Sequence, residues 1–436
     1  MRNSGQSGIR ANALTMLIGP AFAVVASGAK QSSVSRALRP GLPRRYAVRN
    51  DRDTRQSAVR PIALMRNFLI RIAVAVTICA LPGTGHAQNA VLQEAIGLFG
   101  QATFLKIGAP GMVLVVVRGN DHIVMGYGKV AKDHDAVPDG RSLFRIGSVS
   151  KAFTGELLGS MAADGTIRLT APLADYAPPS ARLPEAGGRP ITLLDLATHT
   201  AGLPRDLPDD KYNGEDWKQT AVDRFDYLAG LTLLWPPGTG AAYSNLGFNL
   251  LGDALVQAGK HDYEALLRSR IADPLGMADT TAAPNAEQCA RLMIGGGLTP
   301  AAPCRDTRST AASGGLYSTG NDMAIWLAHN LSTDKPATWT TLALTQAVYR
   351  QRATLAPIIG LGGMDGMALG WEFVAASGHT PALLEKNGAT DGFLAQATIA
   401  PGRGVGVFLV VNQLDFTAFG AMAEAARSMI ETLAVR

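Results

Sequence analysis

The length, composition and charge of the chain exclude several classes of protein. Its 436 residues are 47% hydrophobic and 17% charged, which is too apolar for a disordered chain and enough for one large domain or two ordinary ones. Residues 1–87 hold 13 of the 40 basic residues and two of the 35 acidic ones, so residues 88–436 carry a net charge of −6. This balance argues against a nucleic-acid partner. No later window is long and apolar enough to predict a stable transmembrane span.

The front of the chain has the pattern expected of a targeting signal. Residues 65–87 comprise a short basic segment, an apolar run and small residues at the end, which is the pattern of a secretory signal peptide. We expect its removal to leave one domain at 88–436. Residues 1–64 are interpreted as a non-native or leader extension, with Met65 as the true start. The alternative is that residues 14–26 form the targeting segment of a longer precursor.

Sheet signals occur at both ends of the expected domain. A helix over 89–106 precedes apolar runs at 112–117 and 122–128, and a Gly-Asn-Asp turn joins these runs as a hairpin. Near the other end, Gly-rich turns separate three further strand-like segments, and a helix at about 417–433 follows. These three segments cover residues 382–386, 393–399 and 405–412.

The order of these signals predicts an α+β fold. Helical patterns alternate with proline-containing and irregular loops in the middle of the chain, at about 171–339. The simplest assembly is an antiparallel sheet from about 88–170 and 340–436, flanked by the N- and C-terminal helices. The mostly helical region is inserted between the two parts of the sheet.

A serine and a lysine three residues apart form the first candidate for chemistry. Ser148 and Lys151 stand at the head of an apolar-periodic helix, so the amine returns to within reach of the serine oxygen. A lysine in a dry pocket can have its pKa lowered enough to accept the serine proton. The positive end of the helix dipole stabilises a developing oxyanion. Two other S-x-x-K matches lie in the leader and directly before a proline, so neither heads such a helix.

Two later motifs offer groups that could act with this serine. Tyr243 can relay protons, and Asn245 can hold an amide carbonyl of a substrate. Lys386, at the end of a predicted strand, can attract a substrate carboxylate, and Gly388 lets a substrate backbone approach the strand edge. Each has a structural alternative, namely a core tyrosine, a helix cap and a solvated strand lysine. Together and in this order the motifs are more specific than singly.

The cysteines and histidines indicate no metal chemistry. Cys289 and Cys304 are expected to pair in an oxidising compartment, with two buried free thiols as the alternative. The seven histidines are scattered and no CxxC or HExxH occurs, so the sequence supports no metal site and implies no cofactor. His199 is expected to structure a loop and Ser313 to lie in a tight turn near the site.

The order and spacing of the motifs resemble the serine penicillin-recognising enzymes, whose motifs are S-x-x-K, Y-x-N and K-T-G. The Y-x-N form is closer to the class C β-lactamase-like branch. Within that branch, residues 90–430 look similar to D-alanyl-D-alanine carboxypeptidases/endopeptidases of the AmpH type. Besides the cysteine pair, the stretches that carry the likeness are Y-A-P-P at 176–179, L-A-T-H-T-A-G-L-P-R at 196–205, P-L-G-M at 274–277 and S-G-G-L-Y-S-T at 313–319.

The resemblance implies roles for the motif residues. Ser148 is then the acylating nucleophile, Lys151 its general base, Tyr243 the proton relay toward the leaving amine and Asn245 a substrate-amide ligand. The oxyanion hole is expected from the backbone N–H groups of Ser148 and Ala389. The fold implied is that of β-lactamases and transpeptidases.

The third motif departs from the family pattern. Lys386 would position the substrate and favour the ionised relay, with Gly388 beside it. The family usually has Thr or Ser where this chain has Asn387. An amide therefore replaces a hydroxyl that would bind the substrate carboxylate, which puts terminal-carboxylate recognition in question more than acylation.

The resemblance also implies a setting and partners. Such enzymes are periplasmic, trim the peptide stems of peptidoglycan and bind β-lactams covalently, and slow hydrolysis of penicillins is compatible with the motifs. Peripheral association with the inner membrane is compatible with the sequence, and nothing in the sequence indicates the oligomeric state.

Four other functions share parts of this pattern. A class C β-lactamase has the same groups but must also deacylate fast, and a family-VIII-type carboxylesterase often departs from K-T-G, as Asn387 does here. An α/β-hydrolase would show a G-x-S-x-G elbow, which the sequence lacks. A non-catalytic penicillin-binding sensor is expected to lose groups needed for turnover, whereas Ser148, Lys151 and Tyr243 are all present.

Overall fold

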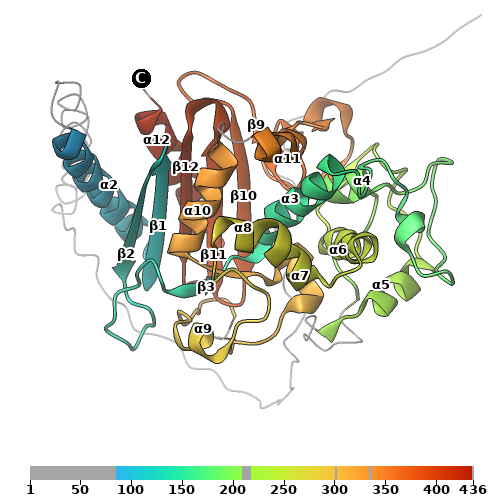
Figure 1. The fold of residues 1–436 in the computed structure, drawn as a ribbon, viewed down its shortest axis with the longest axis horizontal. Helices are drawn as coiled ribbons and strands as arrows, with labels where there is room; N and C mark the ends of the chain where they lie inside the picture. Colours follow the sequence, from blue (N-terminus) through green and yellow to red (C-terminus); the bar gives the residue numbers. More distant parts are fainter. Residues whose placement is uncertain (1–84, 209–217, 300–301, 333–335, 435–436) are drawn as a thin grey trace, which may run out of the picture. The chain divides into compact units, whose positions relative to one another are not determined.

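The computed structural model describes residues 85–208, 218–299, 302–332 and 336–434 (Figure 1). The extension at 1–64 and nearly all of the expected signal peptide lie outside these ranges, so both stay predictions. Within the described ranges, no helix is both long and apolar enough to cross a membrane.

An eight-stranded antiparallel sheet is built from both ends of the expected domain (Figure 1). The hairpin β1–β2 lies beside β12, which gives the order β2-β1-β12-β11-β10-β9-β8-β6. This confirms the predicted α+β class. The strands are β1 (Gly111–Arg118), β2 (Asp121–Gly128), β6 (Arg350–Gln351), β8 (Gly366–Met367), β9 (Glu372–Val374), β10 (Leu383–Thr390), β11 (Phe393–Ala400) and β12 (Val405–Val411).

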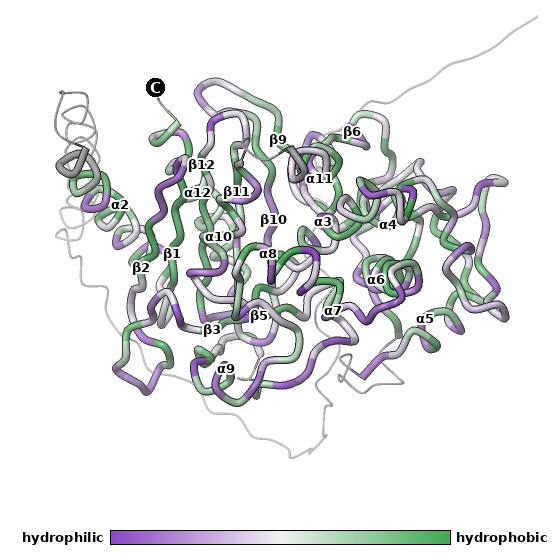
Figure 2. The backbone as a smooth tube through the Cα atoms, in the orientation of Figure 1, coloured by the Kyte–Doolittle hydropathy of each residue, from purple (hydrophilic) through white to green (hydrophobic). Residues whose placement is uncertain are grey.

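The sheet is covered on both faces, which explains why β1 and β12 are almost entirely apolar (Figure 2). Successive side chains of a strand point to opposite faces. Accordingly, Val113 and Val115 of β1 belong to the core shared with α10 (Gly320–Leu331), whereas Met112 and Leu114 belong to the core shared with α2 (Gly85–Ile107) and α12 (Ala418–Leu433).

Three features of the sheet differ from the expectation. The strands β6, β8 and β9 are only two or three residues long, and no periodic pattern marks such short segments. Strand β10 continues to Thr390, beyond the predicted end at 386. The strand β3 (Leu143–Arg145) does not join the sheet but pairs with β5 (Tyr317–Thr319) in a separate two-stranded ladder.

The middle of the chain is mostly helical, as expected. Its long helix α6 packs against α3, and α3 packs against α11, so α3 belongs to the helical part although it precedes residue 171. The remaining helices are α3 (Ser150–Ala163), α4 (Leu193–Ala197), α5 (Ala221–Leu228), α6 (Asn245–Gly259), α7 (Tyr263–Leu267), α8 (Asp273–Leu275), α9 (Ala286–Ala290) and α11 (Pro336–Gln346); the strands β4 (Ala241–Ala242) and β7 (Ile358–Ile359) pair in parallel.

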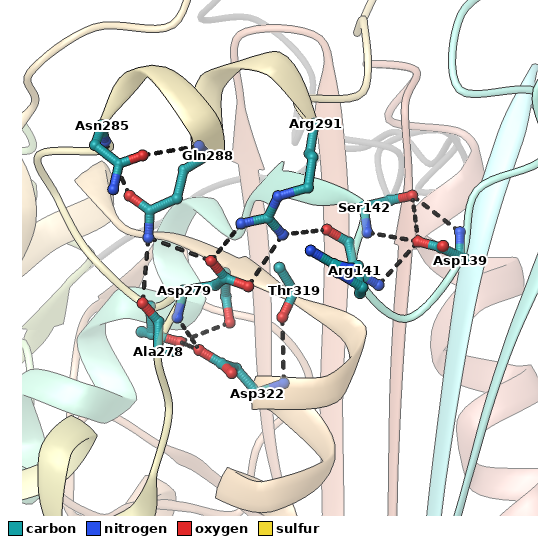
Figure 3. A network of polar contacts seen from close by, with 12 residues as sticks. Asp139, Arg141, Ser142, Ala278, Asp279, Asn285, Gln288, Arg291, Thr319 and Asp322 are labelled. Carbon is teal, nitrogen blue, oxygen red and sulfur yellow. Dashed lines mark hydrogen bonds and ion pairs between the residues drawn. The ribbon is translucent and has the colours of Figure 1, made fainter.

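A polar network fastens the helical region to the segment that leads to Ser148 (Figure 3). The Arg291 guanidinium donates to the Arg141 carbonyl at 2.7 Å and to Asp279 Oδ2 at 3.0 Å. The Asp279 amide in turn donates to Asp322 at 2.8 Å. The Leu143 amide donates to the Arg291 carbonyl at 2.9 Å, so the network holds β3 in place.

A disulfide lies beside the same segment. Cys289 of α9 and Cys304 are bonded, with Cα atoms 5.6 Å apart. Arg145 of β3 donates to the Pro303 carbonyl at 2.6 Å and to Asp391 at 2.9 Å, in the turn between β10 and β11. The disulfide loop, β3 and the end of β10 are therefore tied together.

Candidate active site

Ser148 lies in a tight turn between β3 and α3. The turn is a 3-10 helix at Gly147–Val149. Gly147 has φ of 51°, and a Cβ there would lie 2.8 Å from the Ala389 amide nitrogen, so the turn requires glycine. The Ser150 hydroxyl donates to the Gly147 carbonyl at 2.7 Å. The turn thus holds Ser148 partly exposed at the end of β10.

Lys151 reaches Ser148 from the first turn of α3. Its Nζ donates to Ser148 Oγ at 3.2 Å, to Asn245 Oδ1 at 2.7 Å and to the Ser313 carbonyl at 2.5 Å, which occupies all three donors. The side chain is fully buried. Burial lowers the pKa of Lys151 to about 8, with Lys386 acting in the same direction. A fraction of the amine is therefore neutral at pH 7 and can accept a proton.

Tyr243 contacts Ser148 from a different side. Its Oη donates to Ser148 Oγ at 2.5 Å. Its amide donates to the Ile359 carbonyl at 2.9 Å, where β4 and β7 pair. Burial acts to raise the pKa of Tyr243, but the ammonium groups of Lys151 and Lys386 outweigh it and hold the pKa below its usual 10. Those groups lie 4.7 and 5.2 Å from the ring centroid.

Asn245 is aimed at the site by the start of α6. The cap of this helix is Ser244, whose hydroxyl accepts from the Gly247 amide at 2.8 Å, so the alternative that Asn245 caps the helix is wrong. While Asn245 Oδ1 accepts from Lys151, its Nδ2 donates to Asp206 Oδ1 at 2.8 Å. The amide orientation is thereby set from both ends.

His199 packs against the tyrosine ring and binds the backbone amide that follows it. Its φ is 57° and its side chain is buried, with the ring 4.6 Å from that of Tyr243 and 4.9 Å from that of Phe248. Nδ1 accepts from the Ser244 amide at 3.0 Å. Burial and the nearby Lys386 and other cations lower the pKa of His199 well below its ordinary value, so the imidazole is neutral. This agrees with the structural role expected from the sequence.

The third motif lies on the free part of β10. The neighbouring strand β9 pairs only with Leu383–Glu385 in the described structure, which leaves the β9 side of residues 386–390 without a strand partner. Lys386 is buried, with Nζ 3.5 Å from Glu372 Oε1, so it is not a solvated strand lysine. Asn387 is exposed, although Leu383 and Glu385 on the same face of the strand are buried.

Gly388 serves a different purpose from the one expected. A Cβ at Gly388 would lie 2.1 Å from the Ile146 carbonyl oxygen and 3.0 Å from the Ser148 amide nitrogen. The space over this glycine is therefore filled by the Ser148 turn, and not left open for a substrate backbone. Together with Gly147, it lets the backbones of the turn and of β10 approach each other. This contact brings Ala389 beside the turn, on the wall of the catalytic cavity.

A cavity of about 140 Å³ opens over Ser148. The turn expected around Ser313 and Gly314 forms part of its wall. Sequence reasoning missed the polar residues Asp206, Gln219, Asn249 and Thr310; Asn249 could have been found, because it follows Asn245 by one helical turn. A larger hollow of about 830 Å³ beside residues 351–358 contains none of the motif residues. The lining of the catalytic cavity is Ser148, Asp206, Leu207, Gln219, Asn245, Leu246, Asn249, Thr310, Ser313, Gly314, Ala389 and Thr390.

The arrangement suits covalent catalysis by serine. Two groups that can exchange protons contact the same hydroxyl, one with a depressed amine pKa and one with a depressed phenol pKa. Within the described ranges, no three His, Cys, Asp or Glu side chains gather where they could hold a metal ion.

Comparisons with known proteins agree with this geometry. The family model described as Beta-lactamase matches residues 93–429. The chain is 35% identical to the D-alanyl-D-alanine-carboxypeptidase/endopeptidase AmpH of Escherichia coli (strain K12), over 85% of this chain and 97% of that protein. It is 28% identical to a Beta-lactamase of the same strain, over 77% of this chain and 94% of that one. A crystal structure of a Beta-lactamase/D-alanine Carboxypeptidase from Yersinia pestis, complexed with citrate, aligns with a TM-score of 0.74 and 36% identity, over 80% of this chain and 100% of that one.

Proposed function

The chain belongs to the beta-lactamase family, and on this premise we propose that it is a serine D-alanyl-D-alanine carboxypeptidase and endopeptidase acting on peptidoglycan peptides. The observation that carries the proposal is the contact of one serine hydroxyl with both Lys151 Nζ, at 3.2 Å, and Tyr243 Oη, at 2.5 Å. The similarity to AmpH and to the Yersinia pestis structure supports the choice of substrate.

Acylation begins with transfer of the Ser148 proton to neutral Lys151. The serine oxygen attacks the carbonyl carbon of the penultimate D-alanine, and the oxyanion accepts hydrogen bonds from the backbone N–H groups of Ser148 and Ala389. The C–N bond then breaks. The leaving amine takes a proton through Tyr243, and the Lys151 ammonium beside the phenol supplies the replacement. The products are an ester on Ser148 and a free amine, which is D-alanine or the amine of a neighbouring stem.

Deacylation reverses these roles. Water attacks the ester carbonyl and gives a proton to the Tyr243–Lys151 pair, and Ser148 regains its proton as the C–O bond breaks. With a β-lactam, acylation opens the ring and the amine stays attached to the acyl group. Water must then reach the ester past that group. We therefore expect penicillins to remain bound and any β-lactamase activity to be weak.

Substrate binding draws on the residues around the serine. The free edge of β10 offers backbone groups to an extended peptide, and Asn245 holds an amide of the acyl group. Lys386 attracts the terminal carboxylate, and the next residue of the strand, Asn387, presents an exposed amide. Peptidoglycan peptides and β-lactams are thus the expected partners, and export by the segment at 65–87 would bring the enzyme to them in the periplasm.

The test combines a single substitution with two measurements. Intact-mass spectrometry after exposure to benzylpenicillin should show a full-mass adduct on the wild-type protein and none on Ser148→Ala. Digestion of purified muropeptides, followed by chromatography with mass detection, should show loss of terminal D-alanine and cleavage of cross-links. An adduct that persists in Ser148→Ala contradicts the assignment of the nucleophile. Efficient turnover of p-nitrophenyl esters with no cleavage of either muropeptide would instead establish the carboxylesterase alternative, which the amide at Asn387 favours.

A further inference from the structure

A carboxylate lies inside the catalytic cavity and has no part in the proposed mechanism. Asp206 lines the cavity together with Ser148. Its Oδ1 accepts from Asn245 Nδ2 at 2.8 Å, and Asn245 Oδ1 accepts from Lys151 at 2.7 Å. Asp206 is therefore two hydrogen bonds away from the amine that serves the nucleophile.

The carboxylate can still accept a further donor. Besides Asn245, it contacts the Arg205 guanidinium, whose Nε lies 3.3 Å from Asp206 Oδ2. The Arg205 side chain is 64% exposed and that of Asp206 49% exposed, and such an exposed pair is weak and screened by salt. A carboxylate has about four lone-pair positions. The two contacts therefore leave room for a ligand.

The charges around the cavity are divided between two sides. Lys151 and Lys386 are buried on the side of Tyr243, where a carboxylate of the substrate is attracted. The cavity lining around Asp206 comprises neutral residues such as Gln219, Asn249 and Thr310, and within the described part of the chain it includes no lysine or arginine. A cation entering on this side meets the Asp206 carboxylate. The Arg205 guanidinium that contacts the same carboxylate is largely exposed, so water and salt screen its repulsion.

We propose that Asp206 is a specificity-determining residue that binds an ammonium group on the acyl side of the substrate. The inference rests on the proposed function and defines its substrate more closely. The preferred substrate is a stem peptide in which the residue before the two terminal D-alanines is a diamino acid with a free side-chain amine. The terminal carboxylate lies toward Lys386 and the ammonium toward Asp206, so the scissile bond is centred on Ser148. Because the Asp206 side chain is half-exposed, a charge-assisted hydrogen bond of this kind changes affinity by about three- to fivefold.

The substitution Asp206→Asn separates recognition from positioning. The asparagine carbonyl can still accept from Asn245 Nδ2, so the orientation of that amide is kept while the charge is lost. Asp226→Asn is the matched control, because Asp226 is an exposed acid of α5 outside the cavity lining and the change in net charge is the same.

Two pairs of compounds differ by one ammonium group on the acyl side. The first is a D-Ala-D-Ala pentapeptide with the diamino side chain free or acetylated, compared by kcat/KM. The second is ampicillin and benzylpenicillin, compared by the rate constant of acylation. Wild type and Asp226→Asn should prefer the ammonium member about three- to fivefold, and less at high salt. Asp206→Asn should equalise the members of a pair and leave the neutral member within about twofold of wild type.

The outcomes are distinct. Loss of the preference in Asp206→Asn, in either pair, supports the proposal. An equal fall for both members of each pair shows that Asp206 only positions Asn245 and overturns it, as does an unchanged preference in both pairs. If no pentapeptide is cleaved, the proposed peptidase function fails, and the β-lactam pair still decides the role of Asp206.

Discussion

The sharpest consequence of the site is the pH dependence of acylation. Lys151 accepts the Ser148 proton only when neutral, and its pKa is about 8 because the side chain is buried. About a tenth of the amine is neutral at pH 7 and about nine-tenths at pH 9. The second-order rate constant for acylation by benzylpenicillin should therefore rise about tenfold between these pH values. The Tyr243–Lys151 pair shares the ionisation, so the apparent pKa belongs to the pair.

The assay is a stopped-flow or quenched mass-spectrometric measurement of acylation between pH 6 and 10. Benzylpenicillin has no group that titrates in this range, so the rising limb reports the enzyme. Because the Lys386 ammonium lowers the pKa of both Lys151 and Tyr243, Lys386→Gln should move the limb to higher pH, whatever its effect on the maximal rate. A rate constant that is flat from pH 6 to 9, or a limb that stays in place in Lys386→Gln, would refute the reasoning.

Three further predictions follow from the same contacts. Lys151→Met should be more stable than wild type. The pKa of Lys151 in the folded protein, about 8, lies below the ordinary 10.5, so between these pH values the folded state binds fewer protons than the unfolded state. The wild type therefore gains stability as the pH rises from 8 to 10.5. Denaturant titrations should show that the free energy of unfolding of the variant exceeds that of wild type by up to about 3 kcal/mol below pH 8, and that this difference shrinks toward pH 10.5. A difference that does not depend on pH would contradict the prediction. Gly388→Ala should lower acylation by at least about a hundredfold and reduce Tm, because its Cβ would lie 2.1 Å from the Ile146 carbonyl; normal acylation would show that the turn can shift. Asn387→Thr should raise kcat/KM for a pentapeptide about two- to tenfold through one restored hydrogen bond and leave short esters unaffected, and equal effects on both substrates would contradict a role in carboxylate recognition.

The parts of the fold that the sequence predicts are those with a repeating local pattern. The strands β1, β2, β11 and β12 are runs of apolar or alternating residues, and α6 and α12 repeat at helical spacing. The strands β6, β8 and β9 owe their pairing to neighbours far along the chain and are too short to show a period. The same limit hid the end of β10, where a lysine, an asparagine and a glycine interrupt the apolar pattern.

In the candidate site, too, the sequence predicts local contacts and misses distant ones. Ser148 and Lys151 are three residues apart, so their proximity follows from helix geometry. Asp206 contacts Asn245 across 39 residues, and Glu372 reaches Lys386 through the pairing of β9 with β10. Neither contact has a local signal. The family resemblance predicts that the three motifs share one site. It does not predict Asp206 or Glu372, because these acids lie outside the motifs.

The site also shows why this chemistry needs a large, doubly covered domain. Lys151 and a tyrosine with a depressed pKa contact the Ser148 hydroxyl, and Lys386 lies 5.2 Å from the centroid of that tyrosine ring. Both lysines are almost wholly removed from water. Burying charge that is not fully paired costs several kcal/mol. The near acid, Glu372, stands 3.5 Å from Lys386 and does not contact Lys151. Burial of the Lys151 side chain, with the charge of Lys386 acting in the same direction, lowers the Lys151 pKa toward the working range. The hydrophobic packing on both faces of the sheet must offset the cost of burying these charges. Replacing Lys151 should therefore abolish activity and raise stability.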